Sequence, residues 1–275
     1  MKRKSKSERR YAAKLFNKGR FDEARNLLAG ICNADGTDVD SWLKLAHIHL
    51  HFNDYANSER CCQQVLRVNP EQTKALVLLG NALECQSRPQ EAFSCYQKAV
   101  RIEPAQFESY YFMGNVACTL GHQLKAMDFY RKALHNNPRH FESLNNLGCE
   151  LRKKGQIKEA LVYLDQAMKL KSDSVPLLHN IGLIYLSLSR PDDAVRVFRK
   201  AVSVDPQPFA SHLLLANAYA HKNDLDEALT EYSRALEIKP NNRETCAGKA
   251  SVHERRGEFV VAHELIKPFI TTGNA

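Results

Sequence analysis

Three histidines stand close together near the start of the chain, at His47, His49 and His51. On a helix, His47 and His51 are four residues apart and share one face, a spacing that suits a divalent transition metal. Cys85, 34 residues after His51, is the next candidate ligand. His49 falls on a different face, and packed helices stand about 10 Å apart, which is too far for these side chains to close a site. We therefore predict no metal site and expect His47 and His51 to line a polar surface.

No group of residues in the sequence shows a recognisable catalytic pattern. The sequence has no glycine-rich phosphate loop, no nucleophile elbow and no paired-carboxylate motif. A surface built from helices also offers no closed pocket that excludes water. We predict that the chain is not an enzyme and binds no cofactor.

The elements that position these residues recur every 34 residues. The stretch from Phe107 to His140 reads as two amphipathic helices, separated by Gly121 and closed by Pro138. Closing prolines recur at Pro70, Pro104, Pro138, Pro206 and Pro240. An alanine of the second helix recurs at Ala24, Ala92, Ala126, Ala160, Ala194, Ala228 and Ala262. A period of this length indicates stacked helical hairpins, because one hairpin cannot bury its apolar face alone.

Two further places in the unit complete the pattern. The eighth place is small, at Gly80, Gly114, Gly148, Gly182 and Ala216. The twenty-fourth is often aromatic, at Tyr96, Tyr130, Phe198 and Tyr232. A small residue lets two helices approach closely, and a large one fills the gap that remains. The pattern resembles that of the tetratricopeptide repeat (TPR) family, which implies an all-α fold: a right-handed superhelical solenoid of about eight TPR helical hairpins.

We predict one TPR solenoid domain over residues 1–275. Its repeats are 5–38, 39–72, 73–106, 107–140, 141–174, 175–208, 209–242 and 243–275. The first repeat departs from the pattern at Glu8 and Gly36, and the last departs from it at Lys249. Degenerate end repeats are typical of a solenoid, because each end faces water on one side.

The resemblance implies a concave groove lined by the first helix of each repeat. Carried over by register, the candidate peptide-binding residues are His47, His51, Asn81, Tyr111, Asn115, Asn146, Arg152, Asn180 and Asn217. An asparagine amide both donates and accepts hydrogen bonds, so a row of them suits the backbone of an extended peptide. The alternative is that these amides cap or bridge neighbouring helices. The carboxylate clamp of chaperone adaptors is missing, since its lysine place holds Leu43, Val77, Tyr111 and Asn145.

The net charge of +8 is confined to the start of the chain. Residues 1–20 contain nine basic residues and one acid, and the remaining 30 basic and 30 acidic residues balance. This distribution argues against nucleic-acid binding along the groove. The basic segment is either a solvated first helix or a contact for phosphate or an anionic lipid surface.

Hydropathy and cysteine usage predict a cytoplasmic protein. The sequence has no secretory signal and no apolar run long enough to span a membrane. Its eight cysteines are scattered through predicted helices without a CxxC pair, which is typical of reduced thiols.

The last predicted helix, 258–270, is unusually apolar for the end of a solenoid. It contains Phe259, Val260, Val261, Ile266, Phe269 and Ile270. We expect Pro268 to end or kink this helix about a turn early. The segment resembles the last repeat before the catalytic domain of bacterial TPR-containing sulfotransferases. An apolar end face of this kind favours a homo-oligomer or a downstream domain as partner.

These features of the sequence are compatible with two functions. The first is a protein–protein interaction scaffold that binds an extended peptide segment in its groove. The second is a regulatory, substrate-presenting or oligomerising TPR module of a larger enzyme, such as a sulfotransferase or glycosyltransferase.

Overall fold

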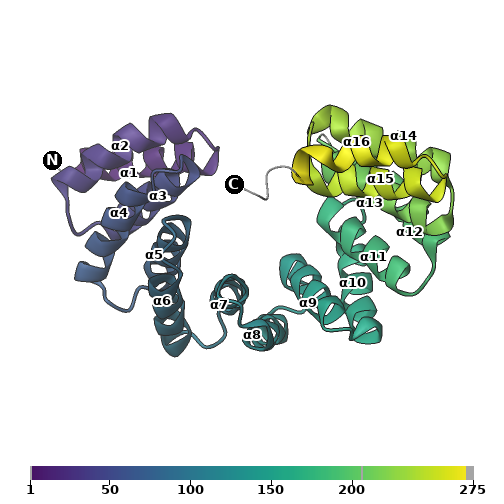
Figure 1. The fold of residues 1–275 in the computed structure, drawn as a ribbon. Helices are drawn as coiled ribbons and strands as arrows, with labels where there is room; N and C mark the ends of the chain where they lie inside the picture. The colour runs from purple at the N-terminus through teal and green to yellow at the C-terminus, as the bar shows by residue number, and fades with distance from the viewer. Residues whose placement is uncertain (1, 206, 271–275) are drawn as a thin grey trace. The chain divides into compact units, whose positions relative to one another are not determined.

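The computed structural model describes residues 2–205 and 207–270, with side chains from Lys6 onward, and these residues form sixteen α-helices and no strand (Figure 1). Pro206 therefore lies outside the described residues. Helices α1 to α8 span Lys2–Asn17, Phe21–Ala34, Val39–His51, Tyr55–Val68, Thr73–Cys85, Pro89–Ile102, Phe107–Thr119 and Gln123–Asn136. Helices α9 to α16 span Phe141–Lys153, Ile157–Leu170, Val175–Ser187, Pro191–Val204, Phe209–Lys222, Leu225–Ile238, Arg243–Arg255 and Phe259–Ile270. None of these helices is both long and apolar enough to cross a membrane.

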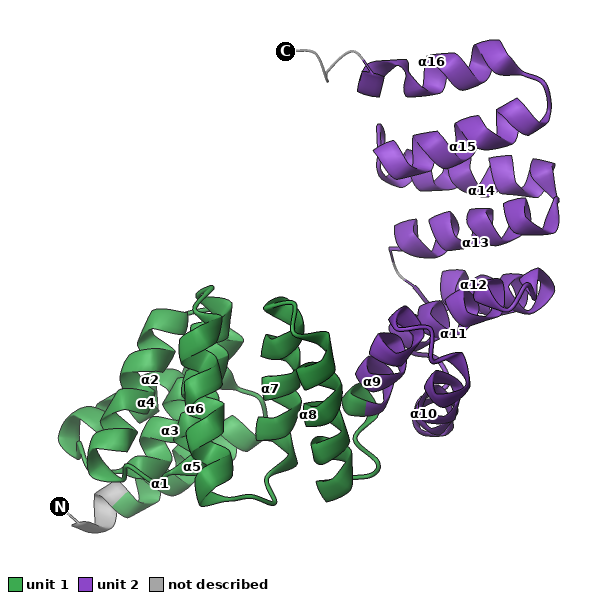
Figure 2. Ribbon diagram, turned by 60° about the horizontal axis from the view of Figure 1, so that its bottom comes forward, with its two compact units in different colours: residues 1–143 green, residues 144–275 purple. Residues whose placement is uncertain are grey.

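The helices follow the 34-residue register of the sequence. The first helix of a repeat begins at Val39, Thr73, Phe107, Phe141, Val175, Phe209 and Arg243. Contacts between helices divide the chain into two compact units, Met1–Ser143 and Leu144–Ala275 (Figure 2). Each unit is built from antiparallel helical hairpins such as α3 with α4 and α13 with α14. A single domain over the whole chain stays a prediction.

In the hairpins with glycine at the eighth place, the core is built on the contact between the eighth and the twenty-fourth places. A Cβ atom added to Gly80, Gly114 or Gly182 would lie 2.4–2.5 Å from a ring atom of the aromatic residue sixteen positions later. Those three rings, of Tyr96, Tyr130 and Phe198, are at most 2% exposed. The second-helix alanines, from Ala24 to Ala262, are also buried. The expected packing of small against large residues is confirmed.

Each hairpin turn places one residue in the left-handed region of the backbone. This residue is the fifteenth of its repeat in all eight cases, with φ between 55° and 79°, at Gly19, Asn53, Ser87, Gly121, Gly155, Ser189, Asn223 and Gly257. The residue after it bonds back to the first helix, as Arg190 N–H does to the Tyr185 carbonyl at 2.8 Å. This pattern closes the helix as a Schellman motif.

The last helix differs from our expectation at its proline. We expected Pro268 to end or kink α16 about a turn early, and the early end is wrong, because the helix continues past Pro268 to Ile270. Proline removes one backbone donor, and its fixed φ is itself a helical value, so residues 269 and 270 keep helical geometry.

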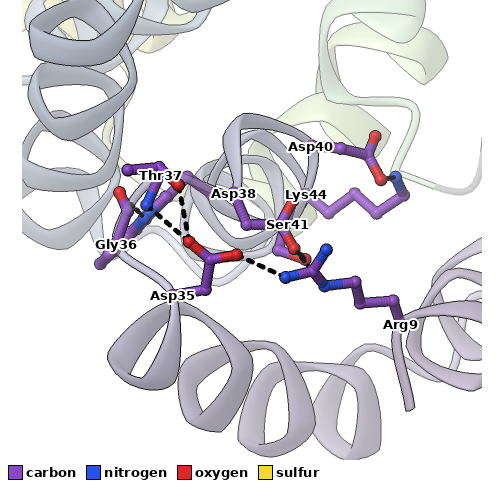
Figure 3. A network of polar contacts seen from close by, with 9 residues as sticks. Arg9, Asp35, Gly36, Thr37, Asp38, Asp40, Ser41 and Lys44 are labelled. Atoms are coloured by element: carbon purple, nitrogen blue, oxygen red, sulfur yellow. Dashed lines mark hydrogen bonds and ion pairs between the residues drawn. The ribbon is translucent and has the colours of Figure 1, made fainter. Parts of the chain in front are cut away.

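A polar network holds the degenerate first repeat together (Figure 3). The Arg9 guanidinium, from α1, lies 2.6 Å from a carboxylate oxygen of Asp35 and 2.9 Å from one of Asp38. Asp38 also caps α3, because its carboxylate accepts from the Ser41 N–H at 3.2 Å. The Trp42 indole donates to the Gly36 carbonyl at 3.1 Å. This loop, which has Gly36 at the place of the closing proline, is therefore fixed by side chains.

Candidate functional site

The nine candidate residues all lie on first helices of the hairpins. Unit 1 carries His47 and His51 on α3, Asn81 on α5, and Tyr111 and Asn115 on α7. Unit 2 carries Asn146 and Arg152 on α9, Asn180 on α11 and Asn217 on α13. These residues differ in their hydrogen-bond partners and in the rings that they contact.

The asparagines at the ninth place share one arrangement. In three repeats, the tyrosine hydroxyl of the second helix donates to the amide oxygen of the asparagine fifteen residues earlier. The pairs are Tyr96 with Asn81 at 2.7 Å, Tyr130 with Asn115 at 2.9 Å, and Tyr232 with Asn217 at 2.6 Å. The hydroxyl fixes the orientation of each amide, since it occupies the acceptor oxygen.

The tyrosines are well suited to this positioning role. Burial raises the pKa of Tyr232 to about 12, to which the charge of Glu244 adds, so the hydroxyl remains a donor at neutral pH. The pKa of Tyr96 is raised for the same reason, and Glu84 strengthens the effect. With their oxygens held by protonated hydroxyls, Asn81 and Asn217 direct their N–H donors away from the tyrosines.

This pairing was missed in the sequence, although a signal for it exists. Asparagine occupies the ninth place in three repeats only, and tyrosine occupies the twenty-fourth place in the same three. The repeat with Phe198 at that place has Leu183 at the ninth. Comparing the two places across repeats would have linked them.

The sixth-place asparagines of unit 2 are used differently. The Asn180 amide donates to the Asn145 oxygen at 3.0 Å, and the Asn145 amide lies 3.4 Å from the Asn146 oxygen. Asn180 is buried. Its bond joins α11 to α9, so Asn180 bridges neighbouring repeats, which is the alternative that the sequence left open.

Tyr111 is held in a cluster of rings. Its centroid lies 4.9 Å from that of His140 and 5.2 Å from that of Phe112, both in unit 1. Burial lowers the pKa of His140, which favours its neutral form at pH 7. Tyr111 therefore offers a fixed, partly exposed aromatic surface on α7.

The two candidate histidines of unit 1 also lie among rings. The ring of Phe21 stands 4.6 Å from that of His51 and 6.3 Å from that of His47. Burial and the neighbouring His51 lower the pKa of His47. Within the described residues, no group of three or more His, Cys, Asp or Glu side chains could hold a metal ion. The third histidine, His49, contacts Asp54 at 2.9 Å.

Arg152 lies on α9 with part of its guanidinium buried. Its Nε atom is inaccessible to solvent and has no hydrogen-bond partner among the described residues. The neighbouring Lys153 instead pairs with Glu150 at 2.6 Å.

Unit 2 contains a cleft that includes Asn217. It has a volume of about 550 Å³ and is formed by α11, α13, Tyr232 of α14, and α15. Its lining residues are Leu183, Leu186, Ser187, Asn217, Ala220, His221, Tyr232, Ser251 and Arg255. The volume falls within the range of about 300–1,000 Å³ that is usual for ligand sites. Of the nine candidate residues, this cleft includes only Asn217.

Comparison with known proteins agrees with this architecture. Three family models, each described as a tetratricopeptide repeat, match residues 43–107 and 179–243, residues 129–162 and residues 107–140. The chain is 26% identical over 117 residues to the BBSome complex member BBS4 of Bos taurus, which covers 42% of this chain and 22% of that protein. The chain thus spans about a fifth or less of the length of the curated relatives it matches.

Two solved structures show the same fold. The Cut9–Hcn1 hetero-tetramer of the APC/C superposes with a TM-score of 0.72 at 18% identity, over 96% of this chain and 52% of the matched chain. YrrB, described as a TPR protein with an unusual peptide-binding site, superposes with a TM-score of 0.57 at 23% identity, over 71% of this chain and 97% of YrrB. Together the family models cover more than half of the residues, in the register of the observed hairpins, and the chain therefore belongs to the tetratricopeptide repeat family.

Proposed function

We propose that this TPR scaffold binds an extended peptide segment of another protein along the first helices of its repeats. The three asparagine–tyrosine pairs carry the proposal. In each pair the tyrosine hydroxyl occupies the acceptor oxygen of the asparagine, and Asn81 and Asn217 present their amide N–H donors from the same place of a repeat. A peptide backbone offers carbonyl acceptors at regular intervals, so such donors would hold it with little dependence on its side chains.

Two further observations support binding over catalysis. The fold is one that carries a peptide-binding site in YrrB. Seven of the nine candidate residues are asparagines, a tyrosine and an arginine on helices, which position a ligand rather than react with it, and the two histidines, His47 and His51, lie against the Phe21 ring without a nucleophile among the candidates.

We also propose a cytoplasmic location. All eight cysteines are free thiols, and Cys32, Cys61 and Cys62 are buried in helices of unit 1. Unpaired thiols of this kind suit a reducing compartment.

An affinity capture experiment tests the groove. The full chain is compared with a variant in which Asn81, Asn115 and Asn217 are all replaced by alanine, and captured proteins are identified by mass spectrometry. We expect the triple variant to lose the captured partners while its circular dichroism spectrum stays unchanged. Asn33→Ala, an exposed amide on the second helix α2, is the matched control and should keep them.

A synthetic peptide from any captured partner then isolates the contact. Its affinity should fall in the triple variant, because each lost hydrogen bond contributes about 0.5–1.5 kcal/mol. Unchanged affinity in the triple variant would contradict the proposal.

The outer face of α16 supports a second candidate, an oligomerising or substrate-presenting module. Phe259 is 68% exposed, Val260 80% and Ile270 57%. Ile266 and Phe269 are half-buried beside them. Exposed apolar residues grouped on one helix are typical of a surface that another molecule covers.

Charge placed on this face tests the second candidate. Phe259→Asp should disperse any oligomer seen by light scattering, whereas the asparagine variants should leave it intact. The second candidate fails if Phe259→Asp leaves the mass of the particle and its partners unchanged.

A further inference from the structure

The cleft of unit 2 is lined by both apolar and basic side chains. Its apolar lining comes from Leu183 and Leu186 of α11 and Ala220 of α13. Its basic lining comes from His221 at the end of α13 and Arg255 at the end of α15. None of the lining residues is an acid.

Arg255 is fixed in place without being neutralised. One terminal nitrogen donates to the Ala220 carbonyl at 2.8 Å, and the other donates to the Asn223 amide oxygen at 2.7 Å. Both partners are uncharged, and no carboxylate pairs with Arg255 among the described residues. A guanidinium carries five N–H donors, so Arg255 keeps donors and its full charge for a ligand.

Two neighbouring cations of unit 2, in contrast, are paired with carboxylates. Arg256 lies 2.7 Å from Asp226 and 3.1 Å from Glu258. Lys222 lies 2.8 Å from Asp224. Of these three cations, only Arg255 lines the cleft, and it is also the one without an acidic partner among the described residues.

Acidic residues close to Arg255 in the sequence or in space do not line the cleft. The charge of Glu244, at the start of α15, raises the pKa of Tyr232, and the charge of Arg255 lowers the same pKa. Glu254 is the residue before Arg255 and is exposed. Neither carboxylate lines the cleft.

We infer that the cleft selects an extended peptide in which an apolar side chain stands within two residues of an aspartate or glutamate. This inference rests on the proposed function and adds a sequence preference to it. The apolar side chain lies against Leu183, Leu186 and Ala220. The Asn217 amide donates to the peptide backbone, and the carboxylate reaches Arg255 and His221.

Selection from a random phage-displayed peptide library on the full chain tests the preference. Enriched peptides should share an apolar residue next to an acid. For a selected peptide with blocked ends, replacing its aspartate by asparagine removes the charge but keeps an acceptor oxygen. This replacement should weaken binding to the wild type by about tenfold, which corresponds to about 1.4 kcal/mol.

Two arginine variants provide the matched comparison by isothermal titration calorimetry. In Arg255→Gln, the aspartate and asparagine peptides should bind equally, whereas Arg256→Gln should keep the tenfold difference. Because Arg255 also holds the end of α13, Ser251→Asp is a second variant. Ser251 is exposed, and an acid there should remove the preference while Arg255 stays in place.

The outcomes separate this inference from the proposed function. If peptides bind through Asn217 but show no preference for an acid, the peptide-binding proposal stands and the inference is wrong. Persistence of the preference in Arg255→Gln would also overturn it. If no peptide is enriched, both fall.

Discussion

Glycine occurs at two places of the repeat for two different physical reasons. At the eighth place the limit is space, because a Cβ on Gly182 would lie 2.4 Å from ring atoms of Phe198. At the fifteenth place the limit is the backbone. Gly155 has φ of 79° and open space where its Cβ would be.

Gly182→Ala tests the limit of space. The added methyl group must displace the buried Phe198 ring, so we expect a loss of about 1–3 kcal/mol in the free energy of unfolding. Gly30→Ala is the matched control, since Gly30 lies within α2 and a Cβ there would meet nothing within 4 Å. That control should gain about 0.5–1 kcal/mol. Urea unfolding followed by circular dichroism measures both, and equal effects would contradict the packing argument.

The cysteines differ in reactivity as their burial differs. Burial raises the pKa of Cys32, Cys61 and Cys62 to about 12 each, so almost no thiolate forms at these positions at pH 8. Because the thiolate is the reacting form, iodoacetamide should alkylate the exposed Cys85 long before them. Mass spectrometry of the native protein measures the order. In urea the difference should disappear, and its persistence there would contradict burial as the cause.

At the scale of the element, the hairpin turn requires one residue with positive φ. Serine occupies this place at Ser87 and Ser189, with φ of 59° and 55°. A residue with a Cβ is strained there by about 1–2 kcal/mol. We expect Ser189→Gly to raise the free energy of unfolding by about 0.5–1 kcal/mol after the greater freedom of glycine in the unfolded chain is counted. The reverse change, Gly155→Ser, should lower it, and a loss of stability in Ser189→Gly would contradict the strain.

The network that holds the first loop should weaken in acid. Hydrogen bonds from Thr37, followed by that from Arg9, lower the pKa of Asp35 below its ordinary value. A lowered pKa in the folded state stabilises the fold above the unfolded pKa, which is about 3.9, and this contribution is lost as the pH falls through the folded value. The stability difference between the wild type and Asp35→Asn should therefore be present at pH 7 and shrink below about pH 4. Urea unfolding at both pH values measures it, and a constant difference would exclude the charge as its source.

Much of the fold was predictable because packing repeats with the sequence. The places of Gly80, Ala92 and Tyr96 recur every 34 residues, so the hairpins and their buried contacts follow from the spacing. The Arg9 network was not predictable, since it lies in the degenerate first repeat, where Gly36 stands at the place of the closing proline. The continuation of α16 past Pro268 was also missed, because the loss of one donor near a helix end does not stop the helix.

The candidate site was predictable in position but not in chemistry. The register placed Asn81, Asn115 and Asn217 on first helices. The hydrogen-bond partner of each asparagine is the residue at the twenty-fourth place of its repeat, and the residue type at that place varies between repeats. The bridging role of Asn180 likewise depends on Asn145 of the preceding repeat, a contact that no single repeat contains.

At the scale of the whole molecule, the chain is divided into two compact units, and we therefore expect it to unfold in more than one step. A solenoid is stabilised by contacts between neighbours, so a local loss of stability spreads only as far as those contacts carry it. Gly114→Ala lies in unit 1 and Gly182→Ala in unit 2. By hydrogen exchange and mass spectrometry, each variant should lose protection mainly in its own unit. Equal loss in both units from either variant would show that the chain unfolds as one cooperative body.

The indole bond of Trp42 to the Gly36 carbonyl has a practical consequence for such measurements. Trp42 is the only tryptophan of the chain, and it stands where the first repeat meets the second. Its fluorescence emission therefore reports on the opening of that one loop, whereas circular dichroism averages over every helix. Recorded on the same sample, the two signals would show directly whether the first repeat opens ahead of the rest.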